Sequence, residues 1–217
     1  MKQETIKRIL SSIIIIPIAL FFIIKGPVYF VFFLIIFFLI TSYEWYRMSR
    51  NKVYRFLGIL FLFLSFYSAY LLRGTNKYDL FIFLFVVTIC VATDIGGYVF
   101  GKLFKGPKLA KISPNKTYSG LIGSYLLSII SANLYLKEST YVMWISSPLI
   151  GNDTLLLLLV FLISSVSQLG DLIVSYFKRL SKIKNTGKLL PGHGGLLDRV
   201  DGLIFALPFA YLLFKLI

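Results

Sequence analysis

The sequence predicts an all-α fold: a polytopic integral membrane protein with about seven transmembrane helices, forming a single membrane-embedded domain over residues 1–217. Hydrophobic residues make up 58% of the chain and charged residues only 15%, too little charge to cover the surface of a soluble domain of this length. Several apolar runs reach the length of about 18 residues at which a helix crosses a bilayer. These observations exclude a soluble protein.

Seven apolar segments predict the individual spans. The first follows Lys2, Lys7 and Arg8, as a signal peptide would, but it ends in "FFIIKGP" without a small-residue cleavage site, so a retained span is expected. The first and last segments are short, which is compatible with a tilted or partly re-entrant helix. The predicted spans cover residues 9–24, 28–46, 56–72, 79–101, 119–136, 154–177 and 202–217.

The distribution of basic residues predicts the orientation of these spans. With seven spans, eighteen of the 23 Lys and Arg residues fall on the side of the N-terminus, mostly in the loops at 47–55, 102–116 and 178–199. Cytoplasmic loops carry an excess of Lys and Arg. We therefore expect a multi-pass protein of the cell inner (cytoplasmic) membrane, with the active site on the cytoplasmic side. In a membrane protein the net charge of +14 fits such loops and anionic ligands, so no nucleic acid is expected as a partner.

Two carboxylates, those of Asp94 and Asp171, fall within or at the cytoplasmic ends of apolar spans. An ionised carboxylate there costs about 3 kcal/mol even on insertion scales, so it should face a partner, an ion or a water-filled cavity. The alternative is an interfacial aspartate that merely reaches water. At about 100° per residue, polar side chains form one stripe along the sixth span, which predicts the wall of a site. The stripe consists of Ser164, Gln168, Asp171, Ser175 and Lys178.

The fourth span ends in "TDIGGYVFGK", where Gly96, Gly97 and Gly101 permit the close approach of another helix. Beside Asp94, this segment suggests a second wall of the same cavity. The basic loop that follows, residues 102–120, contains five lysines and no acid, and its "SPNKTYSG" stretch supplies hydroxyls and backbone donors at the start of the fifth span. Such helix N-termini bind phosphates, although an ordinary positively charged loop is the alternative.

The stretch "PGHGGLLDRVDG", residues 191–202, lies between two apolar spans. Its glycines and proline break a helix and let the backbone approach a ligand, and His193 could donate to a phosphate or transfer a proton. Asp198 and Asp201 are three residues apart and would share a helix face. Carboxylates beside lysines and arginines suit a divalent metal and a polyphosphate. A surface ion-pair cluster is the alternative.

Residues 175–201 read S-Y-F-K-R-x4-K-N-x-G-x2-L-P-G-H-G-G-x2-D-R-x-D and resemble the C-terminal signature of the phosphatidate cytidylyltransferases (CDP-diacylglycerol synthases). The segments "YEWYRM", "TDIGGYVFG", "SPNKTYSG" and "SQLGDL" resemble further patterns of the family in the same order. The resemblance implies transfer of CMP from CTP to phosphatidate, which yields CDP-diacylglycerol and pyrophosphate in phospholipid biosynthesis. It implies Mg²⁺ as the cofactor, with CTP, phosphatidate and membrane lipid as partners, and it is compatible with a homodimer.

The resemblance, together with the patterns above, gives an expected set of site residues. The expected catalytic residues are Asp171, Lys178, Arg179, His193 and Asp198. The expected substrate-binding residues are Lys116, Ser175, Lys184, Arg199 and Asp94. The expected metal ligands are Asp171, Asp198 and Asp201.

Two positions depart from the family pattern. Asn185 stands where the family usually has Asp, and Val174 stands where it usually has Glu before the signature serine. Asparagine still offers a neutral oxygen to a metal, but the site carries less negative charge.

The expected mechanism is in-line attack of a phosphatidate oxygen on the α-phosphorus of CTP, with catalysis from positioning and charge neutralisation. Two alternative functions use similar membrane chemistry: a lipid kinase acting on a polyprenol or similar alcohol, and a cytidylyltransferase for ether lipids. A transporter or ion channel is the alternative of a different class, since intramembrane carboxylates also serve ion pathways.

Overall fold

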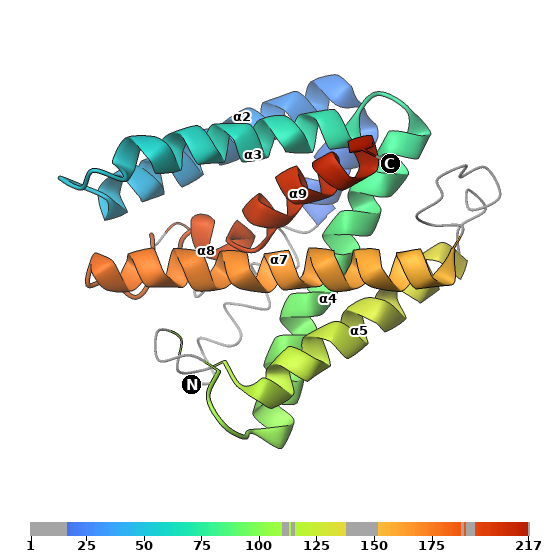
Figure 1. Cartoon of the computed structure of the whole chain (residues 1–217). Helices are drawn as coiled ribbons and strands as arrows, with labels where there is room; N and C mark the ends of the chain where they lie inside the picture. Colours follow the sequence, from blue (N-terminus) through green and yellow to red (C-terminus); the bar gives the residue numbers. More distant parts are fainter. Residues whose placement is uncertain are drawn as a thin grey trace.

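The computed structural model describes residues 17–109, 113, 116–137, 152–187, 189 and 194–216, and these residues form an assembly of helices (Figure 1). Residues 17–25 are helical, and the longer helices follow in chain order. Their bounds are α2 Pro27–Met48, α3 Arg55–Arg73, α4 Lys77–Phe104, α5 Tyr118–Lys137, α7 Asp153–Leu180, α8 Leu197–Val200 and α9 Leu203–Leu216. The described residues contain isolated β bridges, such as the one between Lys108 and Thr117, but no β-strand, so the predicted all-α class is confirmed.

Among the described residues, five helices (α2, α3, α4, α5 and α7) are long and apolar enough to cross a membrane, which confirms the multi-pass prediction. The predicted last span corresponds to α9, which is a shorter apolar helix of 14 residues with Pro208 in its interior. The predicted first span begins outside the described residues. Helices α4 and α7 have 28 residues each, about 42 Å at 1.5 Å per residue, so both are longer than the hydrocarbon core of a bilayer.

Local sequence explains where several helices begin. Pro27 occupies the first turn of α2 directly after Gly26, a position where the missing N–H of proline has no cost. The side chain of Asn152 accepts hydrogen bonds from the backbone N–H groups of Thr154 and Leu155 and so caps α7. The hydroxyl of Thr117 accepts from the N–H of Gly120 at the start of α5. Each cap satisfies backbone donors that the helix itself leaves unpaired.

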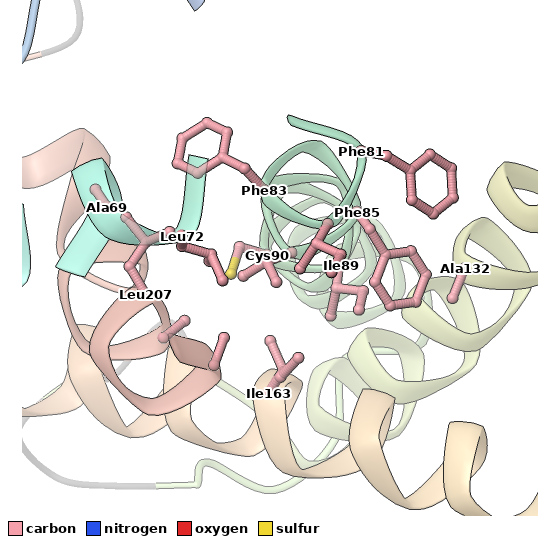
Figure 2. Packing of buried hydrophobic residues seen from close by; sticks show 14 of the residues in the cluster. Ala69, Leu72, Phe81, Phe83, Phe85, Ile89, Cys90, Ala132, Ile163 and Leu207 are labelled. Carbon is pink, nitrogen blue, oxygen red and sulfur yellow. The ribbon is translucent and has the colours of Figure 1, made fainter. Parts of the chain in front are cut away.

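The apolar core is built around α4 (Figure 2). Phe85, Val86 and Ile89 of α4 are completely buried. The side chains that surround them come from four other helices: Ala69 and Leu72 of α3, Ala132 of α5, Ile163 of α7 and Leu207 of α9. Because lipid is as apolar as these side chains, close packing rather than the hydrophobic effect holds such helices together. Helix α4 therefore fixes the positions of α5, α7 and α9 relative to one another.

Helices α4 and α5 approach each other closely through glycines. A Cβ atom on Gly96 would overlap the backbone carbonyl of Gly123, and one on Gly120 would lie 2.7 Å from the carbonyl oxygen of Gly97. The predicted close approach at the glycines of the fourth span is thus confirmed, and the partner helix is α5. This contact brings the loop before α5 beside the C-terminal end of α4.

Hydroxyl groups connect helices α4, α5 and α7 inside the bundle. The hydroxyls of Thr93 on α4 and Ser164 on α7 lie 2.8 Å apart, and the amide nitrogen of Gln168 donates to Ser164 at 3.4 Å. Ser124 of α5 donates to the backbone carbonyl of Thr93 at 2.8 Å. Thr93, Ser124 and Gln168 also line a polar cavity, so this set of hydrogen bonds leads directly to the site.

Candidate active site

Most of the predicted site residues line one polar cavity of about 370 Å³. Its walls come from α4, from the loop before α5 together with the first turns of α5, from α7, from Asn185 and from the turn that contains α8. The charged residues that line it are Asp94, Lys116, Asp171, Lys178, Asp198, Arg199 and Asp201. The structure therefore brings together acids and bases from segments that are more than 100 residues apart in the sequence, and both Asp171 and Asp198 face the same space.

Lys178 lies between two of these acids. Its Nζ atom is 2.9 Å from Oδ1 of Asp198 and 3.8 Å from Oδ2 of Asp201. All three side chains are largely removed from solvent, where a charge is stable only with a close partner. The lysine thus links α7 to the turn that contains α8.

A second lysine pairs with the acid of the α7 stripe. Nζ of Lys116 is 2.8 Å from Oδ2 of Asp171 and 3.2 Å from the backbone carbonyl of Gln168. The hydroxyl of Ser175, one turn further along α7, donates to Oδ1 of Asp171 at 3.3 Å. Lys116 therefore holds the loop before α5 against α7, and the predicted polar stripe of the sixth span faces the protein interior as expected.

Asp171 and Asp201 form a close pair of carboxyl groups, near enough to share a hydrogen bond when one of them is protonated. Asp201 is buried, with 8% of its surface exposed. This burial and the neighbouring Asp171 carboxylate raise the pKa of Asp201 well above its ordinary value. Two adjacent carboxylates are stabilised when a cation binds between them, so this pair is where the cavity is best suited to a metal.

Asp198 makes a different set of contacts. Its Oδ1 atom accepts from Lys178, and its Oδ2 atom accepts from the backbone N–H groups of Thr186 at 2.9 Å and Gly195 at 3.1 Å. Both of its oxygens are therefore engaged by the protein. Among the described residues, no three acid, histidine or cysteine side chains converge closely enough to hold a metal alone.

Some predicted residues do not line the cavity: Ser175 contacts Asp171 from outside the lining, and Arg179 and Lys184 lie elsewhere. Arg179 and Lys184 are exposed and do not line the cavity, and Nη1 of Arg179 is directed at the backbone carbonyl of Ile183 at 3.4 Å. The reason is helical geometry, because Arg179 is turned about 100° from Lys178 on α7. His193 lies outside the described residues.

The two departures from the family pattern lie in different environments. Asn185 lines the cavity beside Gly194. Val174 is 2% exposed and packs in an apolar cluster with Trp45 and Leu197. The replacement at position 174 therefore leaves the cavity unchanged, and only Asn185 removes a negative charge from its lining.

Glu44 accepts hydrogen bonds from residues next to the cavity, and it was not among the predicted site residues. It belongs to α2, is 4% exposed, and accepts hydrogen bonds from the hydroxyl of Thr186 and the backbone N–H groups of Leu196 and Leu197. The available signal was the same as for Asp94 and Asp171: an acid within an apolar span, in the "YEWYRM" segment.

An apolar cavity of about 440 Å³ adjoins the polar one, and Arg199 lines both. Side chains of residues 17–25 and of α2, α3, α4 and α9 form its walls, among them Leu20, Phe33, Phe66 and Leu207. The arginine thus stands where a charged compartment meets a hydrocarbon-lined one.

Comparison with known proteins identifies the family of this chain. The chain matches the family described as the cytidylyltransferase family over residues 6–76 and 53–217. It is 31% identical over 219 residues to the phosphatidate cytidylyltransferase of Rickettsia felis, covering 95% of this chain and 91% of that protein. It is 39% identical over 178 residues to that of Staphylococcus epidermidis, covering 79% of this chain and 64% of the relative. The chain is also 39% identical over 156 residues to the phosphatidate cytidylyltransferase of Brucella suis, covering 71% of this chain and 54% of that protein. With both a family match along most of the chain and a relative matched over nearly its whole length, this protein belongs to the cytidylyltransferase family.

Proposed function

We propose that this protein is a nucleotidyltransferase that transfers CMP from CTP to phosphatidate, with CDP-diacylglycerol and pyrophosphate as products. The relatives named phosphatidate cytidylyltransferase support the reaction. The single observation in the structure that carries the proposal is the position of Arg199, between a cavity of lysines and carboxylates and a cavity of hydrocarbon side chains. A reaction between a polyphosphate and a membrane lipid requires such a junction.

The lipid substrate would bind across this junction. The phosphate of phosphatidate is an anion that pairs with the Arg199 guanidinium, and an acyl chain fits among the apolar side chains beyond it. The nucleotide would bind on the polar side, where Lys116 and Lys178 face the triphosphate. Thr117 and Gly120, also in the cavity lining, lie at the N-terminus of α5, which favours an anion.

We propose Mg²⁺ as the cofactor, with Asp171 and Asp201 as its protein ligands. Mg²⁺ is usually held by one or two carboxylates together with substrate phosphates and water, which fits a close pair of acids better than a complete protein cage. Asp171 would exchange its ion pair with Lys116 for the metal, and Asp198 would join the two acids on release from Lys178. When bound, the ion would neutralise phosphate charge around the α-phosphorus.

In the proposed reaction, a phosphate oxygen of phosphatidate attacks the α-phosphorus of CTP, and the bond from that phosphorus to the β-phosphate oxygen breaks. Pyrophosphate leaves with the bonding electron pair. The attacking phosphate is already anionic at neutral pH, since its second pKa is about 6, so no general base is needed. Lys116, Lys178 and Arg199 would hold the reactants in line and stabilise the charge that develops.

The distribution of Lys and Arg supports placing this site on the cytoplasmic face of the inner membrane, where CTP is available. The purified protein tests the proposal when it is incubated with Mg²⁺, CTP and phosphatidate. We expect equal amounts of pyrophosphate and CDP-diacylglycerol. Turnover with ATP and a polyprenol would instead indicate a lipid kinase, and turnover only with an ether lipid an ether-lipid enzyme. Ion flux in liposomes without pyrophosphate release would indicate a transporter; each of these results contradicts the proposal.

Substitution of Arg199 by Gln tests the junction. We expect the KM for phosphatidate to rise about 10- to 100-fold with a smaller change in the KM for CTP, because a lost charge-assisted hydrogen bond is worth about 1.5–3 kcal/mol. Initial rates at varied phosphatidate and fixed CTP measure the effect. Arg50→Gln, which removes the same charge from an exposed position, serves as the control. A larger rise in the KM for CTP than for phosphatidate would place Arg199 on the nucleotide instead.

A further inference from the structure

Glu44 is a buried acid that accepts hydrogen bonds from uncharged groups of the described residues. It lies on α2 with 4% of its surface exposed, and none of the salt bridges between described residues involves it. A carboxylate removed from water is unstable unless its oxygens accept hydrogen bonds. The three bonds to Glu44 are therefore what allows an acid at this position.

These bonds tie together two segments of the site. Oε2 of Glu44 accepts from the Thr186 hydroxyl at 2.9 Å and from the N–H of Leu197 at 2.8 Å, while Oε1 accepts from the N–H of Leu196 at 2.9 Å. Thr186 follows α7 by a few residues, and Leu196 and Leu197 begin the turn that contains α8. One side chain of α2 thus joins segments that lie more than 140 residues later in the chain.

Asp198 binds the same two segments through other donors. It accepts from the backbone N–H groups of Thr186 and Gly195. Thr186 therefore contacts both acids, through its hydroxyl and its backbone, and residues 195–197 contact both through their amides. We call this arrangement of Glu44 and Asp198 around Thr186 and residues 195–197 the carboxylate clamp.

The space around Glu44 explains two glycines of the signature stretch. A Cβ atom on Gly187 would lie 2.5 Å from Oε1 of Glu44, and one on Gly195 would lie 2.5 Å from Oε2. The Gly195 Cβ would also overlap the hydroxyl of Thr186. The backbone therefore lies so close to the Glu44 carboxylate that only glycine fits at these two positions.

The clamp determines where the next residues face. Asp198 and Arg199 follow directly after the two amides that Glu44 binds, and both line the polar cavity. We infer that Glu44 is a positioning residue, which holds Thr186 and residues 195–197 so that Asp198 and Arg199 face the substrates. This inference rests on the proposed function for its catalytic consequence, although the clamp itself is independent of it.

Substitution of Glu44 by Gln is the sharpest test, because the shape is kept and one acceptor becomes a donor. In either orientation the new NH₂ group faces a backbone N–H, of Leu196 or of Leu197. We expect kcat to fall about 10- to 100-fold, as for other supporting residues, with the KM for CTP changed less than about threefold. We also expect faster amide hydrogen exchange at residues 195–197, measured by mass spectrometry on the protein in detergent. A merely structural effect would lower the fraction of folded protein without this split between kcat and KM.

Two substitutions of Thr186 test the same hydrogen bond from the side of its donor. Thr186→Val removes the side-chain bond to Glu44 and should lower kcat in the same direction, and Thr186→Ser, which keeps the hydroxyl, should restore it. Arg47→Gln, an exposed position on the same helix, is the control for α2. If Glu44→Gln does not fold, Thr186→Val carries the same two measurements.

The results of these experiments distinguish failure of the carboxylate clamp from failure of the proposed function. Unchanged exchange at residues 195–197 in Glu44→Gln would overturn the clamp, and faster exchange with unchanged kcat would overturn its role in positioning. A wild-type protein without cytidylyl transfer, combined with faster exchange in the variant, would overturn the proposed function and leave the clamp standing.

Discussion

Replacing Asp171 with Asn is expected to lower kcat for Mg²⁺-dependent cytidylyl transfer about a thousand-fold. Asparagine keeps the size of the side chain but removes the charge that faces Asp201 and pairs with Lys116 at 2.8 Å. A loss of about 4 kcal/mol of transition-state stabilisation is within what a metal and its ligands supply, and each 1.36 kcal/mol corresponds to a factor of ten. Pyrophosphate release at several Mg²⁺ concentrations measures the effect, and the apparent requirement for Mg²⁺ should rise as well.

The matched control for this variant is Asp153→Asn, at the exposed opposite end of the same helix. It removes an equal charge from α7 outside the cavity, so its kcat should stay within about twofold of the wild type. Membrane insertion and yield of both variants show whether the fold persists. Wild-type kcat and an unchanged Mg²⁺ requirement in Asp171→Asn would contradict the assignment of Asp171 as a metal ligand.

Hydropathy and helical periodicity were sufficient for most of the fold. The spans around α2, α3, α4, α5 and α7 could be placed because each is a long apolar run whose backbone must be satisfied internally in lipid. Their ends could not, since α4 and α7 continue through polar residues to Phe104 and Leu180. Hydropathy also could not distinguish a full span from the 14-residue α9, because α9 is even more apolar than the longer helices.

Periodicity likewise identified the residues of α7 that face the site. Asp171 and Lys178 are seven residues apart, two helical turns, and both line the cavity. Arg179 and Lys184 were expected there because of the motif they belong to, and a motif does not specify which way a side chain faces. Their exposed positions follow from rotation along α7 and from the irregular segment after it.

The contacts of Glu44 could not be derived from the sequence because they join α2 to residues near the end of the chain. Sequence patterns report neighbours within one helix, whereas the donors to Glu44 come from Thr186, Leu196 and Leu197. The pairing of Asp198 with Lys178 is similar, since a sequence separation of 20 residues leaves many arrangements open. An acid within an apolar segment predicts that a partner exists but does not identify it.

Replacing Lys178 with Met is expected to lower kcat about 100- to 1,000-fold and also to destabilise the protein. Methionine has a similar length but no charge, so Asp198 and Asp201 would lose the cation that lies 2.9 Å and 3.8 Å from them. Breaking a buried ion pair by removing one partner costs about 3–5 kcal/mol. The loss of a charge directed at the reacting phosphates accounts for the fall in kcat. Steady-state kinetics and the midpoint of thermal unfolding in detergent measure the two effects.

A double-mutant cycle with Asp198→Asn separates these effects. Asparagine in place of Asp198 can keep its amide oxygen toward the N–H groups of Thr186 and Gly195 while its NH₂ group replaces the oxygen that faced Lys178. In that background Lys178→Met should cost less stability, because one unpaired acid is gone. If Lys178 acts only by neutralising Asp198, the second substitution leaves kcat of Asp198→Asn unchanged. If it also contacts the phosphates, as we expect, kcat falls at least another tenfold, while Lys52→Met, an exposed lysine, has no such effect in either background.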